Sequence, residues 1–503
     1  MTSYQCGGHR CQARGEHENT GLFFGDGRTK DAQGNYVFDF DFLRGLTTAS
    51  EEKKDEAQEA PRSLRKRQAP ASKEKSGKKV GKAIEATPVC AGCPVHCCKQ
   101  CSLHCPPPGT PTPSPTPPLP TPPVPTPPTP NPPVPGSTPV SVQLPSAYYN
   151  DRVVEAIDRG NGDYELIGKT DPINGKSLVI KVIDAQEVGF DVNKSYSMQQ
   201  VARFPAHVIN VSECMRFKDI VASLRDKTTR TPQEEQKFLR GLIYLNSVDV
   251  MFGAKQYIPW LYKFTGLSNI NDDSVNFLAC FVNLKGLDNA FFSGMFMVFG
   301  AGSDLFYPLG DLGVMFHELS HGFVQKKIGL IYQGHAGAMN EHIADTCSIF
   351  CERETYRQFN EDTDPGNDLR GKFDWQMGEM IGKRLRILRN FQNPEDAPSP
   401  QPSTFKGKYW VDPNSASDYG GVHSNSGPLN RFVYELVQQV GWDVAGAVLM
   451  FSWGLLTAKS NMIHYRDALK KAGMQNSCLA QVQACLNTVG LTDSAVNDWK
   501  GSA

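Results

Sequence analysis

The chain lacks several features that would each point to a particular class of protein. No stretch of about 18 apolar residues occurs, which argues against a transmembrane helix. The first residues hold no apolar run of the signal-peptide type, so no standard secretory signal is visible. The formal net charge is −1, so no overall field would draw the protein to a membrane or to nucleic acid. We therefore expect neither a membrane span nor a nucleic-acid partner.

Residues 1–105 differ in composition from the rest of the chain. They are polar and charged, and they hold eight of the 14 cysteines. Because little amphipathic periodicity follows Leu46, we expect a low-complexity, mostly disordered region with at best one hairpin within residues 22–43. The cluster CAGCPVHCCKQCSLHC at residues 90–105 is compatible with a zinc knot, a disulfide knot or an unstructured cysteine-rich tail, and all three readings stay open.

Proline dominates residues 106–140. Such a run favours polyproline II and cannot build a core, and at about 3.1 Å per residue it would separate its ends by up to roughly 100 Å. The plain interpretation is a linker. The alternative is a docking site for a partner domain that reads proline motifs.

The remaining residues look globular and fall into two parts. Residues 141–330 contain strand-like segments such as SLVIKVIDA (177–185) and FMVFGAG (296–302). Residues 331–503 are mainly helical in pattern, as in PLNRFVYELVQQVG (428–441). We predict an α+β fold with two lobes, a β-rich N-terminal one and an α-helical C-terminal one.

The segment LGVMFHELSHGFVQ (312–325) carries the clearest chemical signal. Its flanks favour a helix, on which His317 and His321 lie four residues apart and face one ion together. Glu318 is one step round the helix, where it can hold a water on that ion and take its proton. Two imidazoles leave a zinc site short of a third protein ligand.

Glu341 is the candidate for that ligand. It lies 20 residues after His321, in a second helical segment that follows a turn marked by Gly334 and Gly337. Two antiparallel helices would bring Glu341 back to the histidine pair. Asp345, one turn further, could accept the other ring N–H of His317 and fix its tautomer.

These residues resemble those of the thermolysin-like peptidases, a family with one zinc ion and Glu as third ligand. The resemblance covers roughly residues 177–503. Besides HELSH it rests on four stretches in the family's order: DNAFFSGMFMVFGAG (288–302), GLIYQGHAGAMNEHIAD (329–345), LRNFQNP (388–394) and DYGGVHSNSGPLN (418–430). It implies a two-lobed zincin fold with the zinc helix at the cleft between the lobes.

The resemblance assigns roles to matching positions. His317, His321 and Glu341 match the zinc ligands, and Glu318 matches the residue that activates the water. The other implied roles are oxyanion stabilisation by His423 and Tyr332, orientation of His423 by Asp418, carbonyl binding by Arg389, and backbone hydrogen bonding of substrate by Asn289 and Ala290.

The resemblance also suggests a substrate preference. Four apolar residues match positions that wall the pocket for the residue after the cleavage point: Phe306, Leu309, Val314 and Leu388. They would favour a Leu, Ile, Phe or Val there. Because apolar residues are usually core, plain packing explains the same four equally well.

Structural calcium is a second implied cofactor. Glu352, Asp374 and Glu379 match carboxylates through which family members hold calcium. Gly313 stands where the resemblance expects an aspartate, and Asp311 is a substitute. This departure argues against two ions and leaves a single calcium open.

Together these observations predict a zinc endopeptidase that cuts protein or peptide substrates through a water activated by zinc. The alternative is a zinc-bound but inactive adaptor. Every matched catalytic position holds the expected residue, which favours the enzyme. A zinc aminopeptidase fits less well, since the cleft strand resembles the endopeptidase form. The resemblance implies secretion, whereas the missing signal leaves the cytoplasm as the alternative.

Overall fold

The computed structural model describes residues 138–173, 175–271, 275–359 and 373–502. It also gives the backbone of four short strands near the start of the chain, of which β1 (Tyr4–Cys6) pairs with β2 (His9–Cys11) and β3 (Arg28–Lys30) with β4 (Tyr36–Phe38), both antiparallel. The second pair falls where a hairpin is predicted. Apart from these strands, the region predicted to be disordered lies outside the described residues, as do the cysteine cluster at 90–105 and the proline run up to residue 137.

Two sheets form the first lobe. The smaller is antiparallel, in the order β10-β7-β6-β5, and contains β5 (Val140–Leu144), β6 (Arg152–Gly160), β7 (Asp163–Glu165) and β10 (Val208–Asn210). The larger follows the order β12-β13-β11-β9-β8, with β8 (Ile167–Lys169), β9 (Val179–Asp184), β11 (Phe277–Leu284), β12 (Ala290–Phe292) and β13 (Phe296–Gly300). Strand β12 is therefore an edge strand, open to pairing with another chain.

Three helices accompany these sheets: α2 (Met198–Arg203), α3 (Val211–Arg225) and α4 (Pro232–Thr265). Helix α4 is the longest of them and begins at a capping box, in which Thr231 and Glu234 bond each other's backbone N–H. Gly266 ends it in the left-handed conformation with φ 76°. Its middle is buried against the larger sheet and the next helix, so the lobe called β-rich has a helical spine that the sequence analysis did not name.

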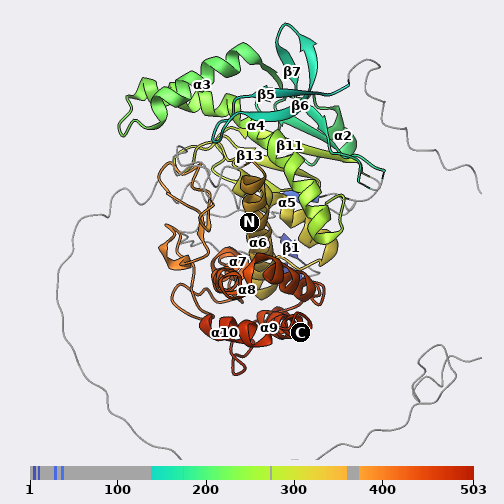
Figure 1. Cartoon of the computed structure of the whole chain (residues 1–503), viewed down its shortest axis with the longest axis vertical. Helices are drawn as coiled ribbons and strands as arrows, with labels where there is room; N and C mark the ends of the chain where they lie inside the picture. Colours follow the sequence, from blue (N-terminus) through green and yellow to red (C-terminus); the bar gives the residue numbers. More distant parts are fainter. Residues whose placement is uncertain are drawn as a thin grey trace, which may run out of the picture. The chain divides into compact units, whose positions relative to one another are not determined.

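Helices α5 (Leu312–Lys327) and α6 (Gly334–Gln358) lie between the sheets and the remaining helices, as Figure 1 shows. Asp311 caps α5 by accepting the Val314 backbone N–H at 2.8 Å. Every residue of α5 from Leu312 to Val324 is buried, and so is every residue of α6 from Gly334 to Glu352. A helix buried on all sides is held by its neighbours, which fixes side chains on both helices precisely.

The second lobe is mostly helical and sits in the lower part of Figure 1. It comprises β14 (Gln376–Met377), β15 (Arg389–Asn390), the 3-10 turn η2 (Pro394–Asp396), α7 (Asp418–Asn425), α8 (Gly427–Trp453), α9 (Met462–Gln475), α10 (Leu479–Thr488) and η3 (Lys500–Ser502). Helix α8 breaks at Gly441, where φ is 77° and ψ is 168°.

The two-lobed α+β prediction is confirmed. The boundary between residues 330 and 331 falls in the connection from α5 to α6 and stays a prediction. Among the described residues, every helix is too short or too polar to cross a membrane.

Candidate metal centre and active site

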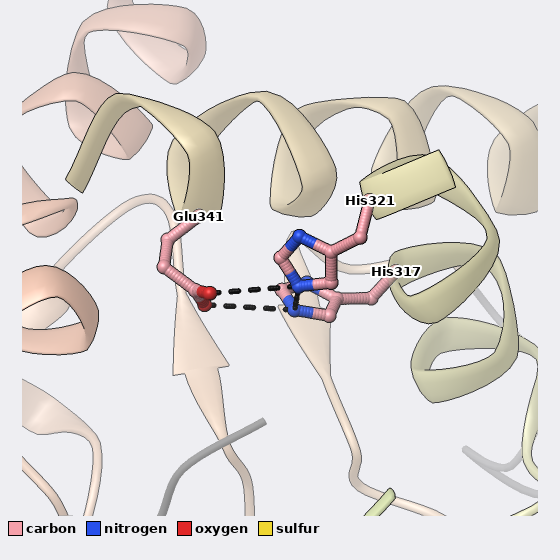
Figure 2. A group of neighbouring side chains, drawn as sticks. All are labelled: His317, His321 and Glu341. Carbon is pink, nitrogen blue, oxygen red and sulfur yellow. Dashed lines mark hydrogen bonds and ion pairs between the residues drawn. The ribbon is translucent and has the colours of Figure 1, made fainter. Parts of the chain in front are cut away.

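Two imidazoles from α5 and one carboxylate from α6 point toward one another (Figure 2). The Nε2 atoms of His317 and His321 are 3.0 Å apart. Glu341 places Oε2 3.5 Å from the first nitrogen and Oε1 3.5 Å from the second. All three side chains are fully buried. These separations are close to the roughly 3.3 Å expected between tetrahedral ligands about 2.0–2.1 Å from one zinc ion.

The outer nitrogens of the two histidines explain why a cation fits here. His317 Nδ1 is 2.8 Å from Asp345 Oδ1, and His321 Nδ1 is 2.9 Å from Asn340 Oδ1. Both partners are acceptors, so both Nδ1 atoms carry the proton and both Nε2 atoms turn lone pairs toward each other. Glu341 Oε2 adds a further buried acceptor with no hydrogen bond in the described part of the chain. The donor set of two neutral imidazoles and a carboxylate suits zinc.

Glu318 lies on α5 beside this group and is fully buried. Burial raises the pKa of its carboxyl to about 8; the neighbouring His317 lowers that pKa and the carboxylate of Glu341 raises it. The backbone of Phe292, on edge strand β12, is also close enough to affect the carboxyl. Glu318 therefore stands between the two histidines and the sheet edge, with a pKa suited to exchanging a proton near neutrality.

A second histidine group faces the first from α7. His423 Nδ1 donates to Asp418 Oδ1 at 2.5 Å, and the backbone N–H of His423 donates to Asp418 Oδ2 at 3.0 Å. Burial lowers the pKa of His423, but Glu341 and Asp418 raise it more, so the pKa lies above the ordinary value. The Tyr332 hydroxyl is 3.0 Å from His423 Nε2 and donates to Glu341 Oε1 at 2.5 Å.

The turn that holds Asp418 is unusual in its backbone. Asp418, Tyr419, Gly420 and Gly421 have φ of 49°, 48°, 83° and 74°, so α7 is regular only after them. Glycine adopts this region freely, whereas Asp418 and Tyr419 do so at a cost of order 1–3 kcal/mol each. The glycine pair predicts a tight turn, which is present. The left-handed run extends two residues further than glycine alone requires, and it directs Asp418 at His423.

Arg389 lies on β15 and is 2% exposed. Its Nε donates to Asp345 Oδ2 at 3.2 Å, and its Nη2 is 3.7 Å from Glu341 Oε2. Arg389 and His317 hold the pKa of Asp345 below its ordinary value, although burial alone would raise that pKa. The guanidinium is thus fixed at the rim of the histidine group by two carboxylates of α6.

The residues expected to contact substrate fall into two sets. Asn289 and Ala290 are buried at the start of edge strand β12, whose partner β13 occupies its other side. The four predicted pocket residues, Phe306, Leu309, Val314 and Leu388, are all buried in the main apolar core. Their burial is what both a pocket wall and plain packing require, so the specificity prediction stays open.

The residues expected at a calcium site form a separate group of carboxylates. Glu352 and Asp311 are buried, Glu379 is partly buried and Asp374 is exposed. Burial raises the pKa of Glu352 to about 8, and the charges of Asp311 and Asp374 add to the rise. Burial and three neighbouring carboxylates likewise raise the pKa of Glu379 well above its ordinary value. These carboxylates are therefore close enough to repel one another.

Sequence reasoning missed several polar residues behind the site. Asn340 orients His321, as described above, and Asn430 donates to Asp345 Oδ2 at 2.8 Å. Gln401 donates to the carbonyl of His423 at 2.6 Å and to the Ser426 hydroxyl at 2.8 Å. Asn340 could have been found, because it directly precedes the predicted ligand Glu341. Asn430 and Gln401 reach the site from elements distant in sequence.

Two family descriptions match the chain. "Thermolysin metallopeptidase, catalytic domain" matches residues 179–325, and "Thermolysin metallopeptidase, alpha-helical domain" matches residues 328–490. The predicted ligands and the residues around His423 all lie within these two stretches.

Curated relatives agree with the family matches. The chain is 33% identical over 214 residues to "Neutral protease" of Vibrio proteolyticus, covering 41% of this chain and 31% of the relative. It is 32% identical over 220 residues to "Hemagglutinin/proteinase" of Vibrio cholerae, covering 41% and 31%. It is 31% identical over 212 residues to "Bacillolysin" of Bacillus amyloliquefaciens, covering 41% and 36%. The similarity thus spans about a third of each relative's length. The chain belongs to the thermolysin family of zinc metallopeptidases.

Proposed function

We propose that the protein is a zinc-dependent endopeptidase, which hydrolyses internal peptide bonds of proteins or peptides. The observation that carries this proposal is the convergence of two Nε2 lone pairs and the Glu341 carboxylate beside a buried, unusually basic Glu318. A binding protein would need the three metal ligands but not the basic carboxyl next to them. An inactive zinc-bound adaptor is the alternative that the experiment below distinguishes.

His317, His321 and Glu341 would hold the zinc ion, with Asp345 and Asn340 keeping both imidazoles in the required tautomer. When bound, zinc supplies Lewis acidity, which lowers the pKa of a water in its coordination sphere to about 7. Arg389 fixes Asp345 and would bind the substrate carbonyl from the rim of the site.

Glu318 would act as the proton carrier of the reaction. It takes one proton from the attacking water as the new C–O bond forms, and it delivers that proton to the amide nitrogen as the C–N bond breaks. The products are a carboxylic acid, which keeps the second proton of the water, and a free amine; the acid then loses that proton to the amine or to solvent. Burial raises the pKa of the Glu318 carboxyl above its ordinary value, which favours the protonated form that the second transfer requires.

His423 and Tyr332 would stabilise the negative charge that develops on the substrate carbonyl oxygen. Both donors converge, with His423 Nε2 and the Tyr332 hydroxyl 3.0 Å apart. Burial lowers the pKa of His423, but Glu341 and Asp418 raise it more, which favours the protonated imidazole as a donor. Donors held in place before the reaction cost no reorganisation when the charge appears.

Substrate would bind as an extended strand beside β12, with Asn289 and Ala290 supplying backbone hydrogen bonds. The residue after the cleavage point would enter a space walled by Phe306, Leu309, Val314 and Leu388. Since all four are apolar, we propose a preference for a bulky apolar residue there. Secretion, the compartment that the resemblance implies, is part of the same proposal.

We further propose a single Ca²⁺ among Glu352, Asp374, Glu379 and Asp311. Buried carboxylates that repel one another are costly unless a cation lies among them, and Glu379 Oε2 has no hydrogen bond in the described part of the chain. Oxygen-only ligands from flexible carboxylates suit calcium.

The test uses the full chain, loaded with zinc, and a quenched peptide library. The wild type should release fragments cut before Leu, Ile, Phe or Val, and Glu318→Gln should bind one zinc but cleave at least about 10³-fold more slowly, because a positioned base is lost. Asp219→Asn, at a surface carboxylate of α3, is the matched control. Zinc binding without any cleavage by the wild type would favour the adaptor, and unchanged cleavage by Glu318→Gln would remove its proposed role.

A further inference from the structure

The residues that follow the matched helical domain pack against the start of α6, next to the candidate active site. The family match ends at residue 490, yet residues 491–501, here called the Trp499 segment, are ordered against the second lobe. Arg466 of α9 donates to the carbonyl of Thr492 at 2.8 Å, and Lys470 of the same helix pairs with Asp493. Trp499 is 3% exposed. This buried indole packs against the first turn of α6.

Trp499 lies directly against the backbone of Gly334. A methyl group on Gly334 would be 2.3 Å from Trp499 Nε1 and 2.8 Å from the carbonyl oxygen of Pro413. Gly334 also has a φ of 51°, which other residues rarely adopt. Two features therefore require glycine as the first residue of α6: the positive φ and the indole packed against its Cα.

Asp498 lies against the neighbouring residue, His335. His335 is fully buried, and its Nε2 is 2.9 Å from Asp498 Oδ1. The other oxygen of Asp498 is 3.2 Å from Lys406 Nζ, and the Asp498 carbonyl accepts from Asn414 at 2.7 Å. Ring contacts of His335 with Phe405, Trp410 and Trp499, at centroid distances of 5.8, 5.9 and 6.2 Å, complete its enclosure.

This contact lies next to the loop that carries Tyr332. Tyr332 is two residues before Gly334 in the connection between α5 and α6, and its own side chain is only partly buried. Gly420, in the turn that presents His423, also approaches Gly334 so closely that a methyl group on Gly420 would be 3.1 Å from the Gly334 Cα. The loop is thus held between the Trp499 segment and the turn that presents His423.

We propose that Asp498 and Trp499 are positioning residues for Tyr332, which they hold toward His423 and the substrate carbonyl by clamping Gly334 and His335. The proposal deepens the proposed function and rests on it. Neither residue touches the reacting atoms. They act through the backbone of the loop. The Tyr332 hydroxyl can stabilise a developing negative charge only if the loop that carries it is held in a fixed position.

The first experiment measures steady-state cleavage by the zinc-loaded chain. Trp499→Ala should lower kcat by about 10- to 100-fold with KM within about twofold, since a displaced donor weakens the transition state more than the ground state. Trp499→Phe should recover most of the loss. Asp498→Asn, a partly exposed position that should fold, should show a smaller loss of the same kind. Asp493→Asn, which removes the ion pair of the segment with Lys470 and none with His335 or Lys406, is the matched control and should leave kcat unchanged.

The decisive comparison repeats Trp499→Ala in a Tyr332→Phe background. If the clamp acts through the Tyr332 hydroxyl, Trp499→Ala should change kcat by no more than about twofold in protein that already carries Tyr332→Phe. An equal loss in both backgrounds would show a general structural effect and overturn the proposal.

Amide hydrogen exchange supplies a measurement that does not depend on activity. In Glu318→Gln protein, Trp499→Ala should speed exchange at Ile331 and Gln333, whose N–H groups donate to Ala458 and Ile331 carbonyls at 2.9 Å. Unchanged exchange would refute the clamp. A wild type that shows no cleavage would instead refute the proposed function, and exchange would still report on the clamp.

Discussion

Asp345 and Glu352 lie on the same helix, seven residues or about two turns apart, and both are buried. Burial raises the pKa of each carboxyl, yet the net shifts are opposite. Arg389 and His317 outweigh burial at Asp345 and hold its pKa below the ordinary value. At Glu352 the nearest charges are other carboxylates, and the pKa rises to about 8.

This difference teaches that burial alone does not decide the charge of a carboxylate in this protein; its partners decide it. Asp345, in the N-terminal half of α6, is compensated by the protein itself, with His317, Arg389 and Asn430 around its carboxylate. The site near Glu352 has few such partners, so its compensation would come from a bound cation. Each prediction below removes one element of that contrast.

The largest effect is expected from removing a hydrogen-bond donor that faces the N-terminal half of α6. His423→Ala leaves Asp418 and Glu341 in place but deletes the imidazole that we propose to face the substrate carbonyl. Turnover should fall by about 10²–10³-fold, the usual cost of losing one oxyanion donor, with KM little changed. Steady-state kinetics on one peptide measures the split, with His464→Ala on the surface of α9 as control. A loss confined to KM would assign His423 to ground-state binding.

A smaller effect should follow the loss of charge at Asp345. Asp345→Asn keeps the shape but weakens the hold on His317 and Arg389, so zinc affinity should drop by about 10- to 100-fold. Competition with a zinc chelator gives the affinity directly. Glu352→Gln, two turns along the helix, is the matched variant and should leave zinc affinity unchanged. Equal losses in both variants would mean that the two ends of α6 are not separate sites.

The convergence of His317, His321 and Glu341 could be predicted because local geometry places these side chains. His317 and His321 are four residues apart on one helix, and Glu341 and Asp345 repeat that spacing on the next. The start of α4 also carried a readable signal, the Thr231–Glu234 capping box with Pro232 between them, which the prediction did not use.

Other features have no local signal. Trp499 reaches Gly334 across 165 positions of sequence, and nothing near either residue predicts that contact. The positive φ of Asp418 and Tyr419 is imposed by the surroundings on residues that do not favour it. Phe306 and Leu388 illustrate a further limit, because a pocket wall and a core position select the same apolar side chains.

The smallest effect concerns the uncompensated site and its dependence on pH. Glu352 has a folded pKa of about 8 and Asp311 of about 7, both above their ordinary values. Raised acid pKa values mean that these groups favour folding fully below about pH 4 and lose that contribution as pH rises toward 8. Without calcium, the melting temperature of Glu318→Gln protein, which cannot digest itself, should fall by on the order of 5 °C between pH 5 and 8.5.

Calcium should reverse the fall, because a cation among the carboxylates favours their charged forms. Adding Glu352→Gln should flatten the pH profile and weaken the response to calcium, whereas Glu354→Gln, an exposed carboxylate on the same helix, should change neither. A profile that rises with pH in calcium-free, zinc-containing buffer would show that the carboxylates find compensation within the chain, and the contrast between the two ends of α6 would fail.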